Sequence, residues 1–512
     1  MRNKNLLLSF VLAAAMTGCV NDADVTSDGG GISKPDARGN MEISFVVPNS
    51  SNGSRSVEDS GIYDSTIPEE YKVTSVTLYL FDSSSKNLVN TFSVSQSELG
   101  TSGKTGGGTK EGETIKYSGT KVLTVDPGTY DILAIANGAM TFNGGQESAL
   151  LAQIDGGTYG NGLINQVPAN GFIMSNRASA NQNVIARSPE EAGADTRTSV
   201  SINLERTVAK LMVRNKTQES YTLANPSGVT YATVRLNNYK FVNLLNKFYT
   251  FRHVATLDNA AETPSAPASY SIAAGNFGNI VDGNGYLIDP CFFDKTVAGA
   301  SSFTGGSFYT NHLSQQADSD WAGLATATEY TSAYCLENCM FRPAQNTTYT
   351  TGIMLKGTFT PAASQTIGND GNAVTNADVF NRLYYFNYKF YTSLESVGRY
   401  GNANISGLSE SSTTEELEAK QIMRFDKNAG VFSTFYNYWI KHQTNNDEAV
   451  MGVMEFGIVR NNIYSVNITN IKNLGPGEPD KKPEPDEYKA YLDVTFGVDP
   501  WIVRDQDASL DK

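Results

Sequence analysis

Several residue types are scarce in this chain of 512 residues. It has 4 cysteines, 3 histidines and 3 tryptophans, and only 18% of its residues are charged. The histidines, His253, His312 and His442, lie far apart and belong to no motif. No HExxH, GxSxG or phosphate-binding P-loop pattern is present, and the glycines of "TGGGTKEG" lack the spacing that cradles phosphate. We therefore expect no enzyme, no catalytic residues and no cofactor.

Metal and disulfide sites have little support. Cys19 aside, three cysteines remain, and an odd number argues against a disulfide framework. Cys335 and Cys339 could pair or bind a metal, but no histidine or further cysteine lies near enough to complete a zinc set. We expect them to be small apolar residues of a strand. The segment "VDGNGYLID" (Val281–Asp289) contains a candidate calcium loop at residues 282–289. The match is only partial, because the terminal glutamate is missing, and a Gly/Asn turn is favoured.

Basic charge is also scarce. The chain has 39 Lys and Arg against 53 Asp and Glu, for a formal net charge of -14. Binding to a phosphate backbone requires clusters of Lys and Arg, and none is found. Nucleic acid is therefore not an expected partner.

The chain has one notable apolar run, at its start. Arg2 and Lys4 precede Leu6 to Met16, a run too short to span a bilayer. "MTGC" follows, which is similar to a bacterial lipobox with Met16 where leucine is usual. Residues 1–18 are thus predicted to be a lipoprotein signal peptide, with Cys19 as the lipidated first residue of the exported chain. The alternative is an ordinary signal peptide with an incidental cysteine.

The rest of the composition is typical of an all-β protein. There are 46 glycines and 26 tyrosines, and short Thr/Val/Tyr/Phe runs alternate with Gly/Asn/Ser/Asp clusters. This pattern predicts tandem β-sandwich units with minor helices. The main predicted strands are Met41–Val47, Lys72–Asp82, Leu88–Val94, Thr120–Val125, Thr129–Asn137, two strands within Ser199–Asn215, Tyr349–Thr360 and Arg460–Ile471.

Other segments are predicted to be a helix, a linker or a candidate binding surface. Ser411–Phe425 is the best helix, capped by Ser411 or Thr413 with glutamates in its first turn. Phe432–His442 could be helix or strand, and helix is favoured. Lys216–Thr230 is predicted to be a linker. An aromatic cluster comprises Tyr384, Tyr385, Phe386, Tyr388, Phe390 and Tyr391. These side chains could stack on sugars, but a strand packed on both faces is favoured.

Two strands far apart in the sequence share one pattern. Apolar residues occupy alternate positions of each strand, with phenylalanine third and valine fourth. They are Met41, Ile43, Phe45 and Val47 in the first strand, and Leu492, Val494, Phe496 and Val498 in the last. Burying four such side chains contributes roughly 6–12 kcal/mol before ordering costs. One groove could therefore hold either strand, although the tail could instead fold back onto its own domain.

An ordered set of segments resembles the fimbrillin family, the pilins of type V fimbriae of Bacteroidia. The first group is the lipobox, "NMEISFVVP", "KVTSVTLYLFD", "GTYDILAIANGA" and "RTVAKLMV". The second group is "YCLEN", "MGVMEFGIVRNNIYSVNITNI", "GPGEP" and "VDPWIV", and it is most similar to the Mfa-type subunits. The long insertions between about Ala255 and Asp320 depart from the family.

The resemblance implies a pilin with two transthyretin-like (Greek-key) β-sandwich domains, exported as an outer-membrane lipoprotein and assembled into extracellular fimbriae. An Arg-specific protease would cut between Arg55 and Ser56 and so remove the first strand. Arg38 is the runner-up, but a cut there would leave the first strand in place. The implied donor strand comprises Leu492, Val494, Phe496 and Val498, followed by Trp501. The implied divisions are 1–18 signal peptide, 19–55 lipidated propeptide with the first strand, 56–217 N-terminal β-sandwich, 218–473 C-terminal β-sandwich, and 474–512 Pro/Gly linker and donor strand.

The partners implied are copies of the same chain in a head-to-tail homopolymer, accessory and anchor subunits, and the outer membrane before maturation. No host or bacterial surface ligand is indicated. Two alternatives remain: a tip or accessory adhesin, and a glycan-binding lipoprotein that stays anchored. A tail that offers a strand favours the polymerising subunit, because a tip subunit has no need to donate a strand. A head-to-tail contact between different surfaces does not close on itself, so it builds a filament.

Overall fold

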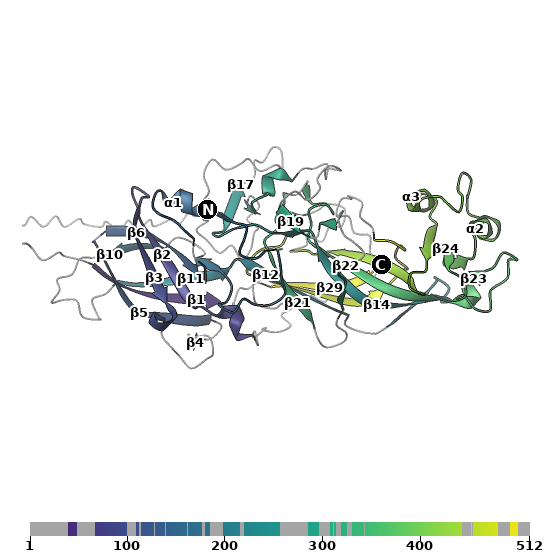
Figure 1. Ribbon diagram of the computed structural model, residues 1–512, viewed down its shortest axis with the longest axis horizontal. Coiled ribbons are helices and arrows are strands. Elements are labelled where there is room, and N and C mark those ends of the chain that lie inside the picture. Colours follow the sequence, from purple (N-terminus) through teal and green to yellow (C-terminus); the bar gives the residue numbers. More distant parts are fainter. Residues whose placement is uncertain are drawn as a thin grey trace, which may run out of the picture.

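The computed structural model is an elongated, mainly β molecule in which three units follow one another along the long axis (Figure 1). The structure describes residues 39–48, 67–99, 109–111, 114–126, 128–138, 140–160, 162–176, 180–184, 198–215, 220–256, 285–295, 308–310, 312–313, 319–324, 330–341, 344–442, 452, 454–479 and 492–499. Among these residues, no helix has both the length and the apolar character that a bilayer crossing requires.

The first unit is a β-sandwich built on one continuous strand order. That order is β3 (Leu88–Ser95), β2 (Ser75–Asp82), β6 (Gly128–Ala136), β9 (Met174–Asn176), β11 (Thr198–Arg206), β1 (Gly39–Pro48), β5 (Thr114–Val125) and β4 (Thr109–Glu111), with β10 (Ala180–Val184) on β6. β2 buries both faces, because Leu78 and Leu80 enter the core of this unit while Tyr79 and Phe81 enter a core shared with the second unit.

The second unit is a sandwich of two sheets with an apolar core between them. One sheet has the order β29 (Leu492–Asp499), β28 (Ile463–Ile471), β12 (Val208–Asn215), β21 (Thr331–Leu336), β8 (Leu163–Ile164). The other has the order β13 (Tyr221–Ala224), β14 (Thr230–Val242), β22 (Gly352–Pro361), β27 (Phe432–Trp439), with β20 (Ala322–Gly323) on β14. The prediction of a mainly β fold with sandwich units is confirmed.

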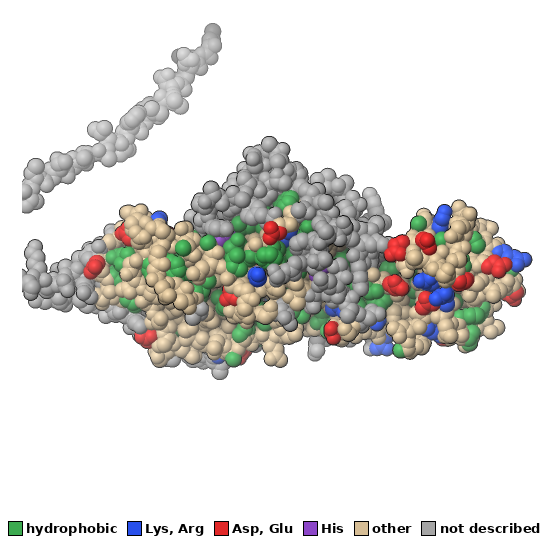
Figure 2. Space-filling model, turned by 45° about the horizontal axis from the view of Figure 1, so that its top comes forward, with side chains coloured by type: hydrophobic (Ala, Val, Ile, Leu, Met, Phe, Trp, Pro, Cys, Tyr) green, Lys and Arg blue, Asp and Glu red, His purple; other side chains and the backbone are tan. Residues whose placement is uncertain are grey.

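A third, smaller unit forms the far end of the molecule (Figure 1). It consists of η8 (Ala363–Gln365), β23 (Thr366–Ile367), β24 (Arg382–Phe386), β25 (Lys389–Tyr391), α2 (Leu394–Gly401), α3 (Thr414–Glu418) and β26 (Met423–Asp426). Figure 2 shows acidic and basic side chains gathered on this end. The expected cap is present, since Thr413 and Glu416 form a capping box for α3. The expected helix is shorter than predicted, because it ends at Glu418 and the chain returns as β26.

Short elements join the first two units. Three two-stranded sheets pair β15 (Leu244–Leu245) with β19 (Tyr309–Thr310), β16 (Phe248–Tyr249) with β7 (Ile154–Asp155), and β17 (His253–Thr256) with β18 (Gly285–Ile288). The remaining helical turns are η1 (Pro68–Tyr71), η2 (Gln96–Glu98), α1 (Glu147–Leu151) and η4 (Phe292–Asp294).

Three expectations differ from the structure. The favoured helix over Phe432–His442 is wrong, because β27 alternates buried and half-buried residues and pairs with β22 along its length. The predicted linker Lys216–Thr230 contains β13 and a turn into β14. β12, expected to close the first unit, pairs instead with β21 and β28, so the change of sheet falls at Thr207 and not after residue 217.

Candidate assembly site

The first strand occupies a central position in the first unit. β1 lies between β11, to which it is parallel, and β5, to which it is antiparallel. Both of its edges therefore carry a ladder of backbone hydrogen bonds. We call the space between β11 and β5 the β1 slot. Removing β1 would leave both neighbouring strands with unpaired backbone groups, which is energetically costly.

The walls of the β1 slot are apolar where the predicted apolar positions of β1 meet them. Ile43 is in register with Val200, and Phe45 with Ile202, and both β11 residues are only 1% exposed. Met41 itself is fully buried in the core of the first unit. Two predicted apolar positions of β1 therefore lie beside buried apolar residues of β11.

On the other side of the slot, Tyr117 of β5 is in register with Phe45. Its hydroxyl donates to the carbonyl oxygen of Tyr71 at 2.8 Å and accepts from the backbone N–H of Val73. Burial raises the pKa of Tyr117 to about 12, so the hydroxyl stays protonated. The sequence missed this residue, because the predicted strand began at Thr120 while "TIKYSGTKVLTV" is one continuous strand.

The chain that follows the predicted cleavage segment is tied to the second unit. Glu70 of η1 is fully buried, and its carboxylate accepts from Lys210 Nζ of β12 at 2.7 Å and from the Tyr334 hydroxyl at 2.6 Å. Arg206 Nε donates to the carbonyl oxygen of Glu70 at 2.6 Å. Loss of β1 would leave these contacts in place, since none of them involves that strand.

The tail strand, β29, lies in the second unit of its own chain. β29 pairs antiparallel with β28 and is the outer strand of its sheet, so the fold-back alternative describes this state of the molecule. Three residues of β28 lie beside the apolar positions of the tail: Ile468, Val466 and Tyr464 are in register with Val494, Phe496 and Val498. These three β28 residues are each at most 2% exposed. Within the described part of the chain, the tail strand thus has one ladder, whereas β1 has two.

The remaining predicted site residues have mixed positions. Cys19, Arg55, Ser56 and Trp501 lie outside the described residues. Cys291, Cys335 and Cys339 are buried free thiols, but only Cys335 lies in a strand. No group of candidate ligands for a metal is found in the described part of the chain.

The aromatic cluster is a hairpin packed into two cores. β24 and β25 pair around a turn at Asn387 and Tyr388, which both have positive φ. Tyr384 and Phe390 are fully buried, in different cores on either side of the hairpin. The packing interpretation of this cluster is supported over the sugar-binding one.

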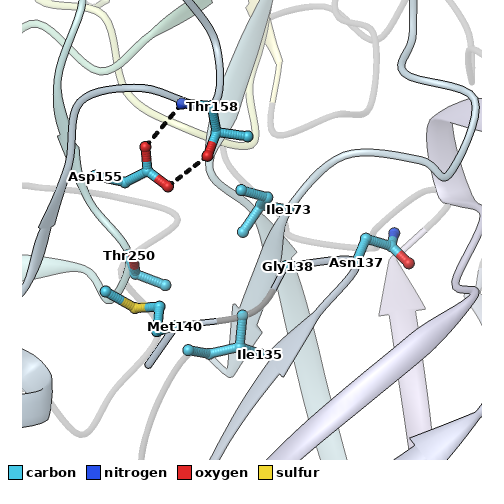
Figure 3. A pocket seen from close by; sticks show the side chains of 8 residues that line it. All are labelled: Ile135, Asn137, Gly138, Met140, Asp155, Thr158, Ile173 and Thr250. Atoms are coloured by element: carbon cyan, nitrogen blue, oxygen red, sulfur yellow. Dashed lines mark hydrogen bonds between the residues drawn. The ribbon is translucent and has the colours of Figure 1, made fainter. Parts of the chain in front are cut away.

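A cavity of about 240 Å³ lies between the first and second units (Figure 3). Its one carboxylate, on Asp155, accepts from the backbone N–H groups of Gly157 and Thr158 and from the Thr158 hydroxyl. The other lining residues shown are Ile135, Asn137, Gly138, Met140, Ile173 and Thr250. These hydrogen bonds of the carboxylate thus lie within its own turn, residues 155–158.

Two family models match the chain. One, "Fimbrillin-A associated anchor proteins Mfa1 and Mfa2", covers residues 34–338, more than half of the chain, and includes β1. The other, "Major fimbrial subunit protein type IV, Fimbrillin, C-terminal", covers residues 431–507 and includes β29. No curated protein matches the chain.

Similar solved structures exist at low sequence identity. A fimbrilin (fimA) from Porphyromonas gingivalis W83 is 18% identical, with 91% of this chain and 98% of that chain covered and a TM-score of 0.40. The tip fimbrial protein Mfa3 from Porphyromonas gingivalis, with a C-terminal truncation, is 11% identical, with 90% and 99% covered and a TM-score of 0.35. Family membership follows from the family models, which confirm the resemblance to Mfa-type fimbrillins. The chain belongs to the family of fimbrillin-A associated anchor proteins Mfa1 and Mfa2, and it is a structural subunit of fimbriae.

Proposed function

We propose that this subunit polymerises head to tail by strand exchange and has a structural rather than a catalytic role. Removal of β1 opens the β1 slot, and β29 of a neighbouring subunit leaves β28 and fills it. The observation that carries this proposal is the difference in pairing, because β1 is bonded on both edges and β29 on one.

The exchange gains more strand pairing than it loses, because β28 gives up one ladder and the slot supplies two. A strand that moves from a sheet edge to the slot gains a second ladder, and each added hydrogen bond contributes about 0.5–1.5 kcal/mol net. The slot also offers the buried residues Val200, Ile202 and Leu123 to the apolar positions of the donor. Strand addition of this kind uses backbone bonds for affinity and alternate side chains for register.

The maturation step is cleavage between Arg55 and Ser56. A cut there frees β1, which ends at Pro48, while the chain from η1 onward stays attached through Glu70, Lys210 and Arg206. Before cleavage, lipid on Cys19 would hold the precursor on the outer membrane. N-terminal sequencing of subunits from fimbriae should begin at Ser56; a mature chain that retains Gly39–Pro48 would contradict this step.

A reversible lock tests the exchange. Asn470 and Asp493 are Cα partners in the β28–β29 ladder, so a disulfide between Asn470→Cys and Asp493→Cys would hold the tail on its own chain. We expect the protease-treated double variant to assemble only after reduction. The buried native thiols Cys291, Cys335 and Cys339 should not compete. The Asn470→Cys single variant is the control, and assembly of the oxidised double variant would refute the exchange.

A terminal position in the fimbrium is a second candidate, favoured by the family model, whose description names anchor proteins. In that case the partners would be fimbrial subunits of another kind, and accessory tip and anchor subunits are proposed partners in either case. Immunogold labelling distinguishes the two roles: a shaft subunit is labelled along the whole fibre, and an anchor or tip subunit at one end.

A further inference from the structure

In the second unit, a buried lysine lies against a buried asparagine and a buried aspartate. Lys295 follows η4, Asp289 follows β18, and Asn338 follows β21. Lys295 Nζ is 2.6 Å from Asp289 Oδ2 and 3.0 Å from Asn338 Oδ1. All three residues are at most 2% exposed. An amine, an amide carbonyl and a carboxylate are therefore held together in the absence of bulk water.

The amide of Asn338 is oriented with its oxygen toward the lysine. Its Nδ2 donates to the carbonyl oxygen of Tyr349 at 2.7 Å and to Thr351 Oγ1 at 2.9 Å. Its Oδ1 accepts from Lys295 Nζ and from the Tyr309 hydroxyl at 3.1 Å. Donors on one side and acceptors on the other fix this orientation, so the carbonyl carbon lies one bond beyond the oxygen that contacts the amine.

We propose that Lys295 and Asn338 form an intramolecular isopeptide bond, with Asp289 as the general base and Tyr309 as the donor to the oxyanion. The inference concerns covalent maturation of the second unit and is independent of strand exchange.

The reaction is balanced without an oxidant or cofactor. Asp289 takes one proton from the Lys295 ammonium, and the neutral amine attacks Cγ of Asn338. The carbonyl oxygen carries the developing negative charge, which the Tyr309 hydroxyl stabilises. The Cγ–Nδ2 bond then breaks, and Nδ2 leaves as ammonia with a second proton from Nζ. The proton held by Asp289 passes to that ammonia, which departs as ammonium.

The surroundings favour this reaction. Tyr309 keeps its proton, because burial raises its pKa well above the usual range. Burial lowers the pKa of Lys295 and the neighbouring Asp289 raises it, with a net rise, so the lysine rests as the ammonium and proton transfer comes first. The fold also holds the amine and the amide in contact, which speeds the reaction because the two groups need not meet by diffusion.

The cross-link would join residues 43 positions apart in the sequence. It would tie the segment that follows β18 to the end of β21, and thereby close the chain around the insertion between them. In a fibre exposed to proteases, a covalent tie of this kind resists local unfolding of that insertion.

Peptide mass spectrometry of the denatured, trypsin-digested full chain tests the proposal. An acylated Lys295 cannot be cut, so we expect a peptide that is uncut after Lys295 and lighter by one ammonia, about 17 Da. Cleavage after Lys295, with the unmodified mass of the peptide that contains Asn338, would overturn the proposal. Loss of ammonia together with cleavage after Lys295 would also overturn it, because it would indicate a cyclised asparagine instead.

Two variants sharpen the result. Asn338→Asp should give the same cross-linked product by losing water in place of ammonia, whereas Lys295→Arg should be digested as an unlinked chain. Since the decisive measurement is made on the wild-type protein, it does not depend on the folding of either variant.

Discussion

At the scale of single residues, buried polar groups connect the units of this molecule. Lys210 and Glu70 are almost fully buried, yet they come from different units and meet at 2.7 Å. Removing one partner of such a pair leaves an unpaired buried charge, which usually costs about 3–5 kcal/mol.

We expect Glu70→Ala to lower the free energy of unfolding by about 3–5 kcal/mol. The matched control is Asp426→Ala, which breaks ion pairs with Arg382 and Arg424 in which the carboxylate is 49% exposed. That change should cost no more than about 1 kcal/mol. Urea denaturation measures both, and equal effects would contradict the assigned importance of the buried pair.

Because His253 is buried, we expect the free energy of unfolding to depend on pH. Burial lowers the pKa of His253 from 6.5 to about 4. Between these values the unfolded chain takes up a proton that the folded chain does not, so stability is lost as the pH falls. Between pH 7 and 4.5, wild type should lose about 2–3 kcal/mol more than His253→Gln. Urea denaturation at the two pH values gives this difference, and parallel losses in both proteins would argue against it.

At the scale of elements, turn signals explain which strands could be identified from the sequence. The sequence predicts β2, β3, β6 and β28, because their apolar residues lie in short runs between clear turn signals. β27 was predicted to be a helix because its aromatic run has no such signals, and only its neighbour β22 determines its conformation. The β1 strand and the tail strand were found from their shared pattern, but their neighbours were not, since pairing between distant strands is a tertiary property.

The contact between β22 and β27 gives a prediction at this scale. A Cβ added at Gly352 would lie 2.4 Å from the ring of Trp439, its partner in β27. Gly352→Ala should therefore destabilise the protein by about 1–3 kcal/mol. Gly323→Ala is the control, because nothing lies within 4 Å of the added atom and the residue is exposed in β20. Thermal unfolding should separate the two variants; equal melting temperatures would count against the packing described.

At the scale of the whole molecule, the slot and the tail belong to different units. The β1 slot is in the first unit and β29 is in the second, and Figure 1 shows these units one after the other along the long axis. A subunit that receives a strand in one unit and donates one from the other can extend a chain of subunits indefinitely. The sequence suggested this from two similar strands, whereas the unequal pairing that favours the exchange became visible only in the fold.

Electron cryomicroscopy of filaments grown from protease-treated subunits tests this claim most directly. The account predicts that the strand between β11 and β5 of each subunit is Leu492–Asp499 of its neighbour, and that β28 has lost its outer strand. Filaments in which Gly39–Pro48 still fills the slot, or in which β29 remains on its own β28, would contradict it.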